Sequence, residues 1–442
     1  MLFDWFKMSS PSNVQLEGEK LDKTYKRLRW QVILAALFGY GLFYVCRLSL
    51  NVIKKPLVDN GILSETELGI VGTGLFITYA IGKFANGFLA DRSNVRRFLS
   101  AGLLLSAAIN LILGFTTSFI VFVILWAVNG WAQSMGAAPC VVSLSRWFGN
   151  KERGTYYGLW SASHNFGEAL TFIATAAIVE ALGWQWGFRG AGVLGLIGVA
   201  IIAIFMRDTP ESCGLPPIAV YKGDEVAVKK EIDKNEVSRV QKAVLKSPAI
   251  WTLALASAFM YISRYAVNSW GIFFLQADKG YDTLEASSII CTIASGWVSD
   301  KFFGGKRYLP AVIFGIMNVL GLVLFLFYPE RNMMLESIAM IIFGLAIGAL
   351  ICFLGGLMAT DIASKKASGA ALGVVGVASY AGAALQDFVS GLTIERTKVV
   401  INGVATYDFS VISWFWLSAA ILSVVCTLIV WWMVKHTKTQ ID

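Results

Sequence analysis

Two stretches that share one pattern decide the fold: residues 40–51 read YGLFYVCRLSLN, and residues 257–268 read SAFMYISRYAVN. Each contains a single charged residue, an arginine, among mainly apolar neighbours, and both fit Tyr-x-x-Arg-x-x-x-Asn. The arginines, Arg47 and Arg264, are 217 positions apart (264 − 47). A motif repeated at this distance indicates a chain built from two halves of similar design.

On either side of these stretches the chain consists of long apolar blocks separated by short polar loops. Only 15% of its 442 residues are charged, whereas a soluble protein carries about a quarter. A helix needs roughly 20 apolar residues to cross a membrane, so the blocks predict an all-α membrane protein with six helices in each half. The twelve predicted spans are 32–51, 68–89, 98–116, 119–143, 154–179, 188–205, 250–275, 284–298, 309–327, 335–359, 368–391 and 409–434.

The polar segments predict the organisation and orientation of the chain. We expect an N-terminal segment at 1–30, a first half at 31–206, a linker at 207–247, a second half at 248–434 and a tail at 435–442. Lys and Arg are concentrated in every second loop, so both termini and the linker should face the cytoplasm. The net charge of +8 is explained by these loops, and we expect no nucleic-acid partner.

The eighth span is predicted to be short. Arg47 and Asp91 are 44 positions apart (91 − 47), but Arg264 and Asp300 are only 36 apart (300 − 264). The apolar run 284–298 would reach about 22 Å as a helix, less than the roughly 30 Å of a bilayer core. We therefore expect a shortened or distorted eighth helix.

The repeated arginines are the strongest functional signal. A guanidinium group stays charged, and its burial in hydrocarbon costs several kcal/mol. Arg47 lies near the end of its span and could extend to the interface, but Arg264 lies well inside its own. Two such arginines in a duplicated carrier should face a central cavity, where their planar forks match the oxygens of a phosphate group.

His164 and Glu168 lie one turn apart in the fifth span. A buried histidine is more often structural than functional, but beside two arginines it could donate to a phosphate oxygen. Glu168 could pair with His164 or with an arginine, or form a purely structural ion pair, and the sequence leaves these alternatives open.

Two further sets of residues repeat. Gly154, Gly158 and Gly167 recur as Gly369, Gly373 and Gly382, as a duplication would explain. Glycine-rich faces such as Gly369 with Gly373, and Gly72 with Gly74, should permit close helix approach as the halves move. Gly87 to Arg92 recur as Gly296 to Lys301. The repeat places an acidic and a basic residue next to each other at two helix ends, where their contacts could form in one conformation and break in another. The residues expected to act as conformational gates are therefore Asp91, Arg92, Asp300 and Lys301.

Several stretches are similar to the organophosphate:phosphate antiporter family of the major facilitator superfamily. These are residues 21–31, 90–94, 151–154, 164–165 and 207–217, the last of which reads RDTPESCGLPP. The likeness is greatest to the bacterial glycerol-3-phosphate transporters, followed by the hexose-phosphate transporters and their sensor relatives. It implies a protein of the bacterial inner membrane that exchanges internal phosphate for an external phosphate ester by rocking its two halves. We expect it to be a monomer.

The resemblance also implies a substrate site. In it Arg47 and Arg264 bind the phosphoryl group and His164 assists, while the other cavity positions are Tyr44, Tyr79, Lys83 and Tyr380. Two residues depart from the family pattern: Leu48 stands where a lysine is common, and Glu168 where a glycine is common. Both changes lower the positive potential of the site.

The remaining alternatives concern function rather than fold. A sugar-phosphate sensor that signals to a histidine kinase would use the same residues as a carrier. A proton-coupled sugar or drug carrier would need an acid inside the membrane, and Glu168 is the candidate in the first half. The six cysteines are scattered, and no phosphate loop, nucleophile–base pair or metal cluster is present, so we expect neither an enzyme nor a cofactor.

Overall fold

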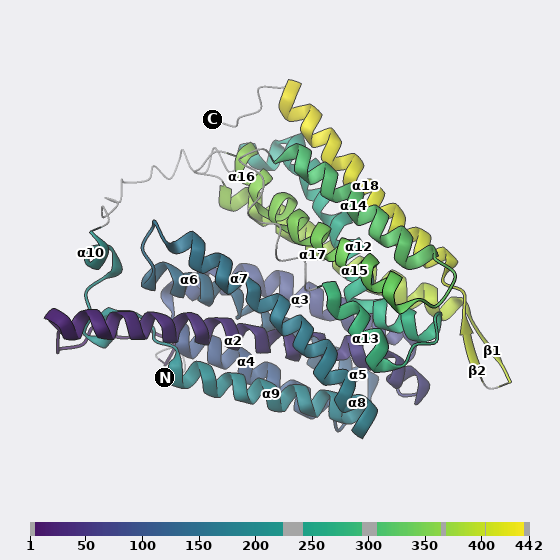
Figure 1. Ribbon diagram of the computed structural model, residues 1–442, viewed down its shortest axis with the longest axis horizontal. Helices are drawn as coiled ribbons and strands as arrows, with labels where there is room; N and C mark the ends of the chain where they lie inside the picture. The colour runs from purple at the N-terminus through teal and green to yellow at the C-terminus, as the bar shows by residue number, and fades with distance from the viewer. Residues whose placement is uncertain (1–4, 224–241, 294–306, 364–367, 403, 437–442) are drawn as a thin grey trace. The chain divides into compact units, whose positions relative to one another are not determined.

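The chain is almost entirely helical. The computed structural model describes residues 5–223, 242–293, 307–363, 368–402 and 404–436 (Figure 1). Eleven helices among these residues are long and apolar enough to cross a membrane. This confirms the prediction of an all-α membrane protein.

The elements fall into an earlier and a later group along the chain. The earlier ones are α2 (Gly18–Asp59), α3 (Glu65–Arg92), α4 (Val95–Leu113), α5 (Phe119–Ser134), α6 (Ala137–Trp147), α7 (Arg153–Leu170), η1 (Thr171–Thr175), α8 (Ala176–Leu182), α9 (Trp184–Phe205), η2 (Glu211–Cys213) and α10 (Ile218–Lys222). The later ones are α12 (Pro248–Ala277), α13 (Thr283–Cys291), α14 (Tyr308–Phe327), α15 (Met333–Cys352), η4 (Phe353–Leu357), α16 (Met358–Ile362), α17 (Ser368–Arg396), β1 (Lys398–Ile401), β2 (Val404–Tyr407) and α18 (Ser410–His436).

The chain divides into two compact units. Unit 1 comprises Met1–Leu50 and Ile81–Lys229, and unit 2 comprises Asn51–Ala80 and Lys230–Asp442. Helices α2 and α3 each contribute residues to both units. Residues 51–80, which the sequence assigns to the first half, therefore pack with the helices of the second.

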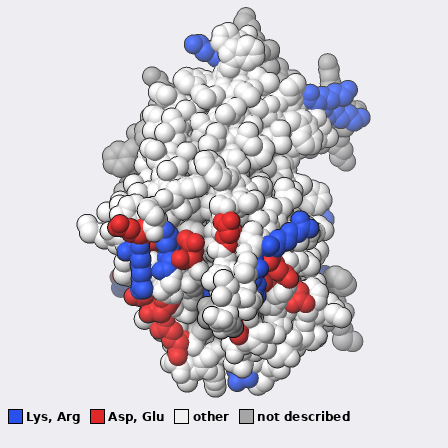
Figure 2. All heavy atoms as spheres, turned by 90° about the vertical axis from the view of Figure 1, so that its right-hand side faces the viewer, with Lys and Arg blue, Asp and Glu red and all other residues white. Residues whose placement is uncertain are grey.

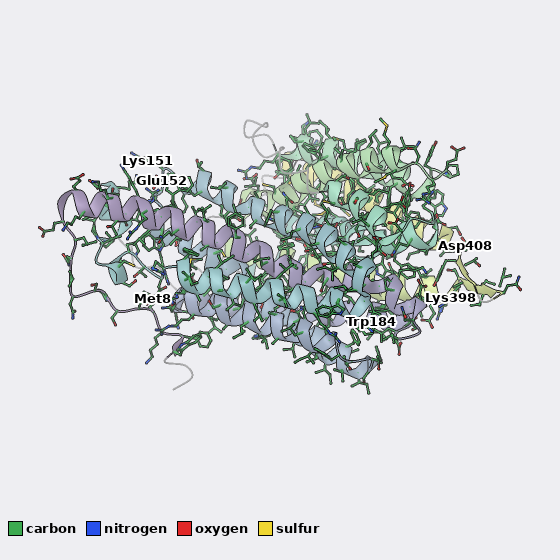
Figure 3. The ribbon with its side chains drawn as sticks, turned by 60° about the horizontal axis from the view of Figure 1, so that its bottom comes forward. Met8, Lys151, Glu152, Trp184, Lys398 and Asp408 are labelled. Atoms are coloured by element: carbon green, nitrogen blue, oxygen red, sulfur yellow. The ribbon has the colours of Figure 1, made fainter. Side chains whose placement is uncertain are left out.

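In unit 1 the helices run up and down between two ends. Met8, Lys151 and Glu152 mark one end and Trp184 the other (Figure 3). Helix α4 packs against α9 and α5. Large aromatic side chains such as Phe43, Phe122 and Phe188 are fully buried between the helices, because the sequence places them on inward faces.

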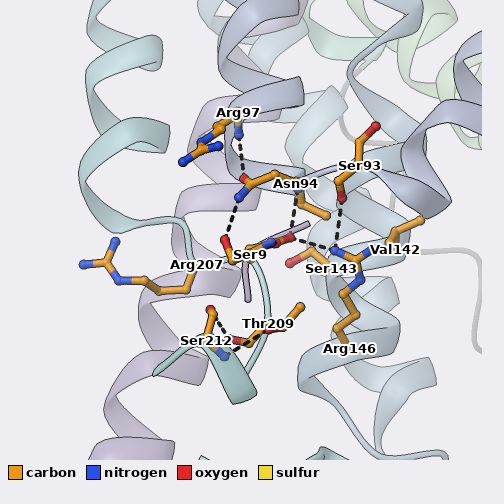
Figure 4. Close-up of polar contacts among 12 residues, drawn as sticks. Ser9, Ser93, Asn94, Arg97, Val142, Ser143, Arg146, Arg207, Thr209 and Ser212 are labelled. Carbon is orange, nitrogen blue, oxygen red and sulfur yellow. Dashed lines mark hydrogen bonds and ion pairs between the residues drawn. The ribbon is translucent and has the colours of Figure 1, made fainter. Parts of the chain in front are cut away.

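A polar network joins the segments at the Met8 end of unit 1. The carboxylate of Asp208 accepts hydrogen bonds from the backbone N–H groups of Ser9 and Val95 and pairs with Arg146 at 2.7 Å. Beside it, Asn94 caps α4 and donates to Ser9 (Figure 4). The residues before α2 are thus tied to the loop after α3 and to the segment after α9.

A second ion pair at this end links α2 to the start of α7. Arg29 stacks over the rings of Phe148 and Tyr156 and binds the Glu152 carboxylate. Burial opposes ionisation of Glu152, but the hydrogen bond and charge of Arg29, aided by Lys222, outweigh it and hold the pKa of this carboxyl below its usual value. The pair therefore stabilises the ionised form.

This ion pair predicts a pH-dependent stability. The pKa of Glu152 is lower in the folded state than in the unfolded state. The stability that the ion pair contributes is therefore complete when the pH is above the pKa of the unfolded state, and it disappears as the pH falls through the pKa of the folded state. We expect Glu152→Gln to lower the melting temperature by a few degrees at pH 7, and by less and less as the pH is lowered below about 4. Thermal unfolding in detergent across this range, with the exposed Glu19→Gln as control, measures it; a constant difference would contradict the assignment.

In unit 2, α12 packs between α17 and α18, and α14 packs against α15 and α18. Strands β1 and β2 form an antiparallel hairpin after α17, with Lys398 opposite Tyr407. Glu65, at the start of α3, binds both Lys398 (2.9 Å) and the Tyr407 hydroxyl (2.7 Å), so the hairpin is fixed to the 51–80 part of this unit.

The outer faces of the long helices are apolar. Val193, Ile197 and Ile204 of α9 and Trp414 of α18 are all more than a third exposed. Figure 2 shows a broad area of the surface without Lys, Arg, Asp or Glu. Such faces belong in lipid, as the hydrophobic runs predict.

Three long helices contain irregular turns. The fourth predicted span breaks at Met135 and Gly136, between α5 and α6, and the tenth contains the π-turn η4, about 218 positions later (353 − 135). The fifth contains the π-turn η1, where the Thr171 hydroxyl donates to the Gly167 carbonyl at 2.6 Å. A π-turn replaces the regular i to i−4 backbone hydrogen bonds over one turn, and such turns are frequent at functional sites. A threonine hydroxyl that bonds to the carbonyl four residues earlier often bends the helix.

The predicted eighth span is only partly described. Helix α13 begins at Thr283, next to the predicted start, and ends at Cys291. Residues 294–306 lie outside the described part of the chain, so the count of twelve spans and the shortened eighth helix remain predictions.

Candidate functional site

In unit 1, three of the predicted residues come together. Arg47 lies on α2 and is 6% exposed, and its guanidinium carbon is 5.8 Å from the ring centre of Tyr44. The Tyr44 ring in turn faces His164 of α7, with 6.0 Å between ring centres. Since these side chains come from different helices, their cluster depends on how α2 packs against α7.

That packing depends on a repeated glycine. A Cβ on Gly167 would lie 2.2 Å from the Gly41 carbonyl oxygen and 2.8 Å from the Cβ of Tyr44. In unit 2, a Cβ on Gly382 would lie 2.5 Å from the Ala258 carbonyl oxygen. Gly41 and Ala258 each precede the repeated arginine by six residues, so the repeat preserves one close helix approach in both units.

Buried asparagines donate hydrogen bonds to the residue that precedes each arginine. The Cys46 carbonyl accepts hydrogen bonds from Asn110 (2.8 Å) and Asn129 (3.1 Å). In unit 2 Asn318 donates to the Ser263 hydroxyl at 3.1 Å. Asn110 and Asn318 are 208 positions apart (318 − 110), close to the 209 between Asp91 and Asp300. The sequence analysis missed them, although this near-equal offset was available.

We expect Asn110→Leu to weaken unit 1. It removes a donor to the Cys46 carbonyl and the acceptor of the Ser49 hydroxyl (2.8 Å), and a buried group left without its partner costs about 1–3 kcal/mol. The melting temperature should fall by about 2–4 °C per kcal/mol. Asn60→Ala, at an exposed position of the same polar type, is the control; equal melting temperatures for both variants would contradict this role.

In unit 2, Arg264 lies among tyrosine rings. Its guanidinium carbon is 5.3 Å from the ring centre of Tyr265 and 5.7 Å from that of Tyr261. Tyr380 of α17 lies 5.4 Å from Tyr261 and 4.7 Å from Tyr79. Both distances from the guanidinium carbon fall within the roughly 6 Å of a cation–π contact, and a guanidinium carries a planar fork of donors that matches carboxylate and phosphate oxygens.

The other predicted residues are less closely grouped. Lys83 is exposed on α3 within unit 1. Asp91 and Arg92 are exposed at the end of that helix. Asp300 and Lys301 lie outside the described residues, so their gating role remains a prediction.

Glu168 is buried on α7, one turn beyond His164 and three residues before η1 begins. This position places a carboxyl close to the cluster of Tyr44, Arg47 and His164 along the helix.

The sequence analysis also missed a buried ion pair in unit 2. Lys54 follows the predicted end of the first span, but α2 continues to Asp59 and buries it. Its partner Asp387 is the one acidic residue of the predicted span 368–391, a signal that could have been read from the sequence.

Membrane-length helices, a duplicated plan and a buried or half-buried arginine in the first helix of each copy define a transporter-type, multi-pass membrane protein and not an enzyme. Residues 33–386 match the sequence model of the Major Facilitator Superfamily, and the chain belongs to this family.

Relatives of known name confirm the resemblance to organophosphate transporters. The chain is 34% identical to the glycerol-3-phosphate transporter of Bacillus subtilis, over 88% of this chain and 91% of that one. It is 32% identical to the membrane sensor protein UhpC of Salmonella typhimurium, with the same coverage. It is also 32% identical to the probable hexose phosphate transport protein of Chlamydia trachomatis, over 85% and 87%.

Solved structures show the same fold at lower identity. A bacterial homologue of the human lysosomal transporter Spinster, inward-facing and unoccupied, matches with a TM-score of 0.68 at 16% identity, over 92% of this chain and 96% of that one. The nucleoside transporter NupG matches with a TM-score of 0.71 at 14% identity, over 91% and 99%. The major facilitator fold is thereby confirmed.

Proposed function

We propose that the protein is a monomeric antiporter of the bacterial inner membrane that exchanges a phosphorylated small metabolite for inorganic phosphate by alternating access. Glycerol-3-phosphate is the favoured ester and a hexose phosphate the next. Relatives named for both esters support this substrate class. The two repeated arginines are the observation that carries the proposal.

The chemistry of the two arginine clusters supports an anionic cargo. A phosphate ester carries a charge of about −1.5 to −2 near pH 7 and offers three acceptor oxygens. Arg47 with Tyr44 and His164, and Arg264 with Tyr261, Tyr265 and Tyr380, would supply charge-assisted donors to them. We propose that both arginines bind the same phosphoryl group.

Obligate exchange follows from the same charges. A cationic site that is empty is unfavourable inside a membrane, whereas a bound dianion neutralises it. The empty carrier would therefore reorient slowly and the loaded one readily. Inorganic phosphate, which has the charge and oxygens but not the organic group, would serve as the counter-substrate.

The contacts within unit 2 support a conformation closed on one side. If both termini are cytoplasmic, as we propose, the 51–80 segment lies on the outer side. It contacts α12 and α17 through Asn51 to the Asn268 carbonyl (2.9 Å), Thr73 to the Ala384 carbonyl (3.0 Å) and the ring pair Phe76–Tyr265. These contacts would have to open to admit cargo from outside.

Exchange in proteoliposomes tests the proposal. We expect rapid uptake of labelled glycerol-3-phosphate into vesicles loaded with phosphate, and at least about tenfold slower uptake into vesicles loaded with sulfate or buffer. Unlabelled glucose-6-phosphate and phosphate, added outside, rank the substrates by competition. Equal uptake without internal phosphate would exclude obligate exchange.

The relative named as a sensor supports a second candidate, a sugar-phosphate sensor that signals to a histidine kinase. Such a protein would bind the ester through the same arginines but would exchange it too slowly to supply the cell with the ester. Calorimetric binding by the purified protein together with absent exchange in vesicles would favour the sensor over the carrier.

A further inference from the structure

A fully buried charged cluster in unit 2 has no part in the function proposed above. Lys54 is 0% exposed and Asp387 1%. The Lys54 ammonium donates to the Ser269 hydroxyl at 2.7 Å, and that hydroxyl donates to Oδ1 of Asp387 at 2.6 Å. Trp270 donates to the same Oδ1 at 2.8 Å, and the ammonium lies 3.8 Å from the Trp270 ring centre.

The lysine is held less completely than the aspartate. Oδ1 of Asp387 takes two neutral donors, whereas the ammonium is 3.6 Å from it, beyond the roughly 2.7–2.9 Å of a hydrogen-bonded ion pair. An ammonium has three donors, and among the described residues that of Lys54 makes one hydrogen bond, to Ser269. A ligand with several anionic oxygens would offer acceptors to its two other donors.

The cluster lies beside a close approach of two helices. A Cβ on Gly72 would lie 1.8 Å from Oδ2 of Asp387, and one on Gly69 would lie 2.6 Å from the Asp387 carbonyl oxygen. On the other side, a Cβ on Gly391 would lie 3.0 Å from Gly69 Cα. Helix α3 thus meets α17 across glycines, with few side chains to disengage.

A buried ion pair is weak evidence for stability, because the loss of hydration offsets the attraction between its charges. A charged pair that forms in one conformation and breaks in another can act as a switch. Its separated charges can bind a charged ligand, which an apolar contact of the same size cannot do. Lys54 brings to this place a cation that an anionic cargo needs, and Asp387 brings the counterion that the cation needs when no cargo is there.

We propose that Lys54 is a third cationic ligand for the phosphoryl group, and that Asp387 is the counterion that replaces the cargo while residues 51–80 are packed on α12 and α17. When this contact opens, the ammonium leaves Ser269 and Trp270 and binds the oxyanion. When it closes, Asp387 takes the ammonium back. The inference rests on the proposed transport of a phosphate ester. It adds Lys54 as a residue that sets the affinity of the carrier for an ester that enters from the side on which this contact opens.

Uptake of labelled glycerol-3-phosphate by intact cells that lack other carriers for it tests the proposal through the split between KM and maximal rate. We expect Lys54→Gln to raise KM about tenfold or more, the effect of losing a charge-assisted contact. Asp387→Asn should lower the maximal rate without raising KM. The double variant should keep the raised KM of Lys54→Gln. Lys55→Gln, which loses only the surface pair with Asp59, should stay within twofold of wild type.

A purely structural pair gives a different pattern. In that case removing both charges together restores KM to the wild-type value, and this result overturns the proposal, as does a KM for Lys54→Gln equal to that of Lys55→Gln. If either of these two results is found while the wild type takes up the ester, the proposed transport stands and only the role of Lys54 is overturned. Absent uptake and absent calorimetric binding of the ester by the wild type would overturn both. Should Lys54→Gln not fold, a raised KM in Asp387→Asn alone overturns the proposal.

Discussion

Replacing Arg264 with alanine should abolish measurable binding of the phosphate ester and of inorganic phosphate. The substitution removes a permanent charge and a planar pair of donors from among tyrosine rings that cannot replace them. Each charge-assisted hydrogen bond contributes about 1.5–3 kcal/mol, so the loss of two reduces affinity by at least about a hundredfold. Calorimetry on the purified protein measures this.

Two further variants sharpen the Arg264 experiment. Arg264→Lys keeps the charge but not the fork and should give an intermediate affinity. Arg396→Ala removes an exposed arginine from the end of α17 in the same unit and should bind as the wild type does. Unchanged ester binding by Arg264→Ala would favour a proton-coupled sugar or drug carrier instead.

Adding one methyl group at Gly167 should disrupt the candidate site in unit 1. The new Cβ would lie 2.2 Å from the Gly41 carbonyl oxygen, so α7 and α2 must move apart and carry His164 away from Tyr44. A displacement of about 1 Å at a binding site costs up to about a hundredfold in function. We expect Gly167→Ala to lose most of its affinity for the ester and to melt at a lower temperature.

Gly158 provides the matched control on the same helix. Nothing lies within 4 Å of a Cβ at this position, so Gly158→Ala should melt at or slightly above the wild-type temperature, because alanine favours helix over glycine by about 1 kcal/mol. Gly382→Ala and Gly373→Ala repeat the comparison in unit 2. Equal effects of Gly167→Ala and Gly158→Ala would contradict the proposed helix contact.

The fold was predictable because lipid leaves the backbone little choice. Every N–H and C=O inside a bilayer must be paired within the protein, so apolar runs of sufficient length become helices. The repeat from Arg47 to Arg264 then predicted two similar halves, and the structure explains the repeated Gly167 and Gly382 as close helix approaches. The close approach expected at Gly72 is present, but a Cβ at Gly369 or Gly373 would meet nothing within 4 Å among the described residues, so no helix comes close there in this conformation.

Several features were not predictable from local sequence. Lys54, Lys55 and Asp59 read as a polar loop, and only contacts from α12 and α17 show that α2 continues through them. The π-turns η1 and η4 change the hydrogen bonding without a Pro at either place. Asp387 was visible in the sequence, but its importance depends on a partner more than 300 positions away.

The most direct test of the account is a double-mutant cycle for Arg47 and Arg264, read as the affinity of the purified protein for inorganic phosphate. If both arginines bind one phosphoryl group, either alanine substitution alone should remove nearly all affinity, and the double variant should bind no worse than each single one. Losses that simply add, or one arginine whose removal leaves the affinity at the wild-type value, would contradict it.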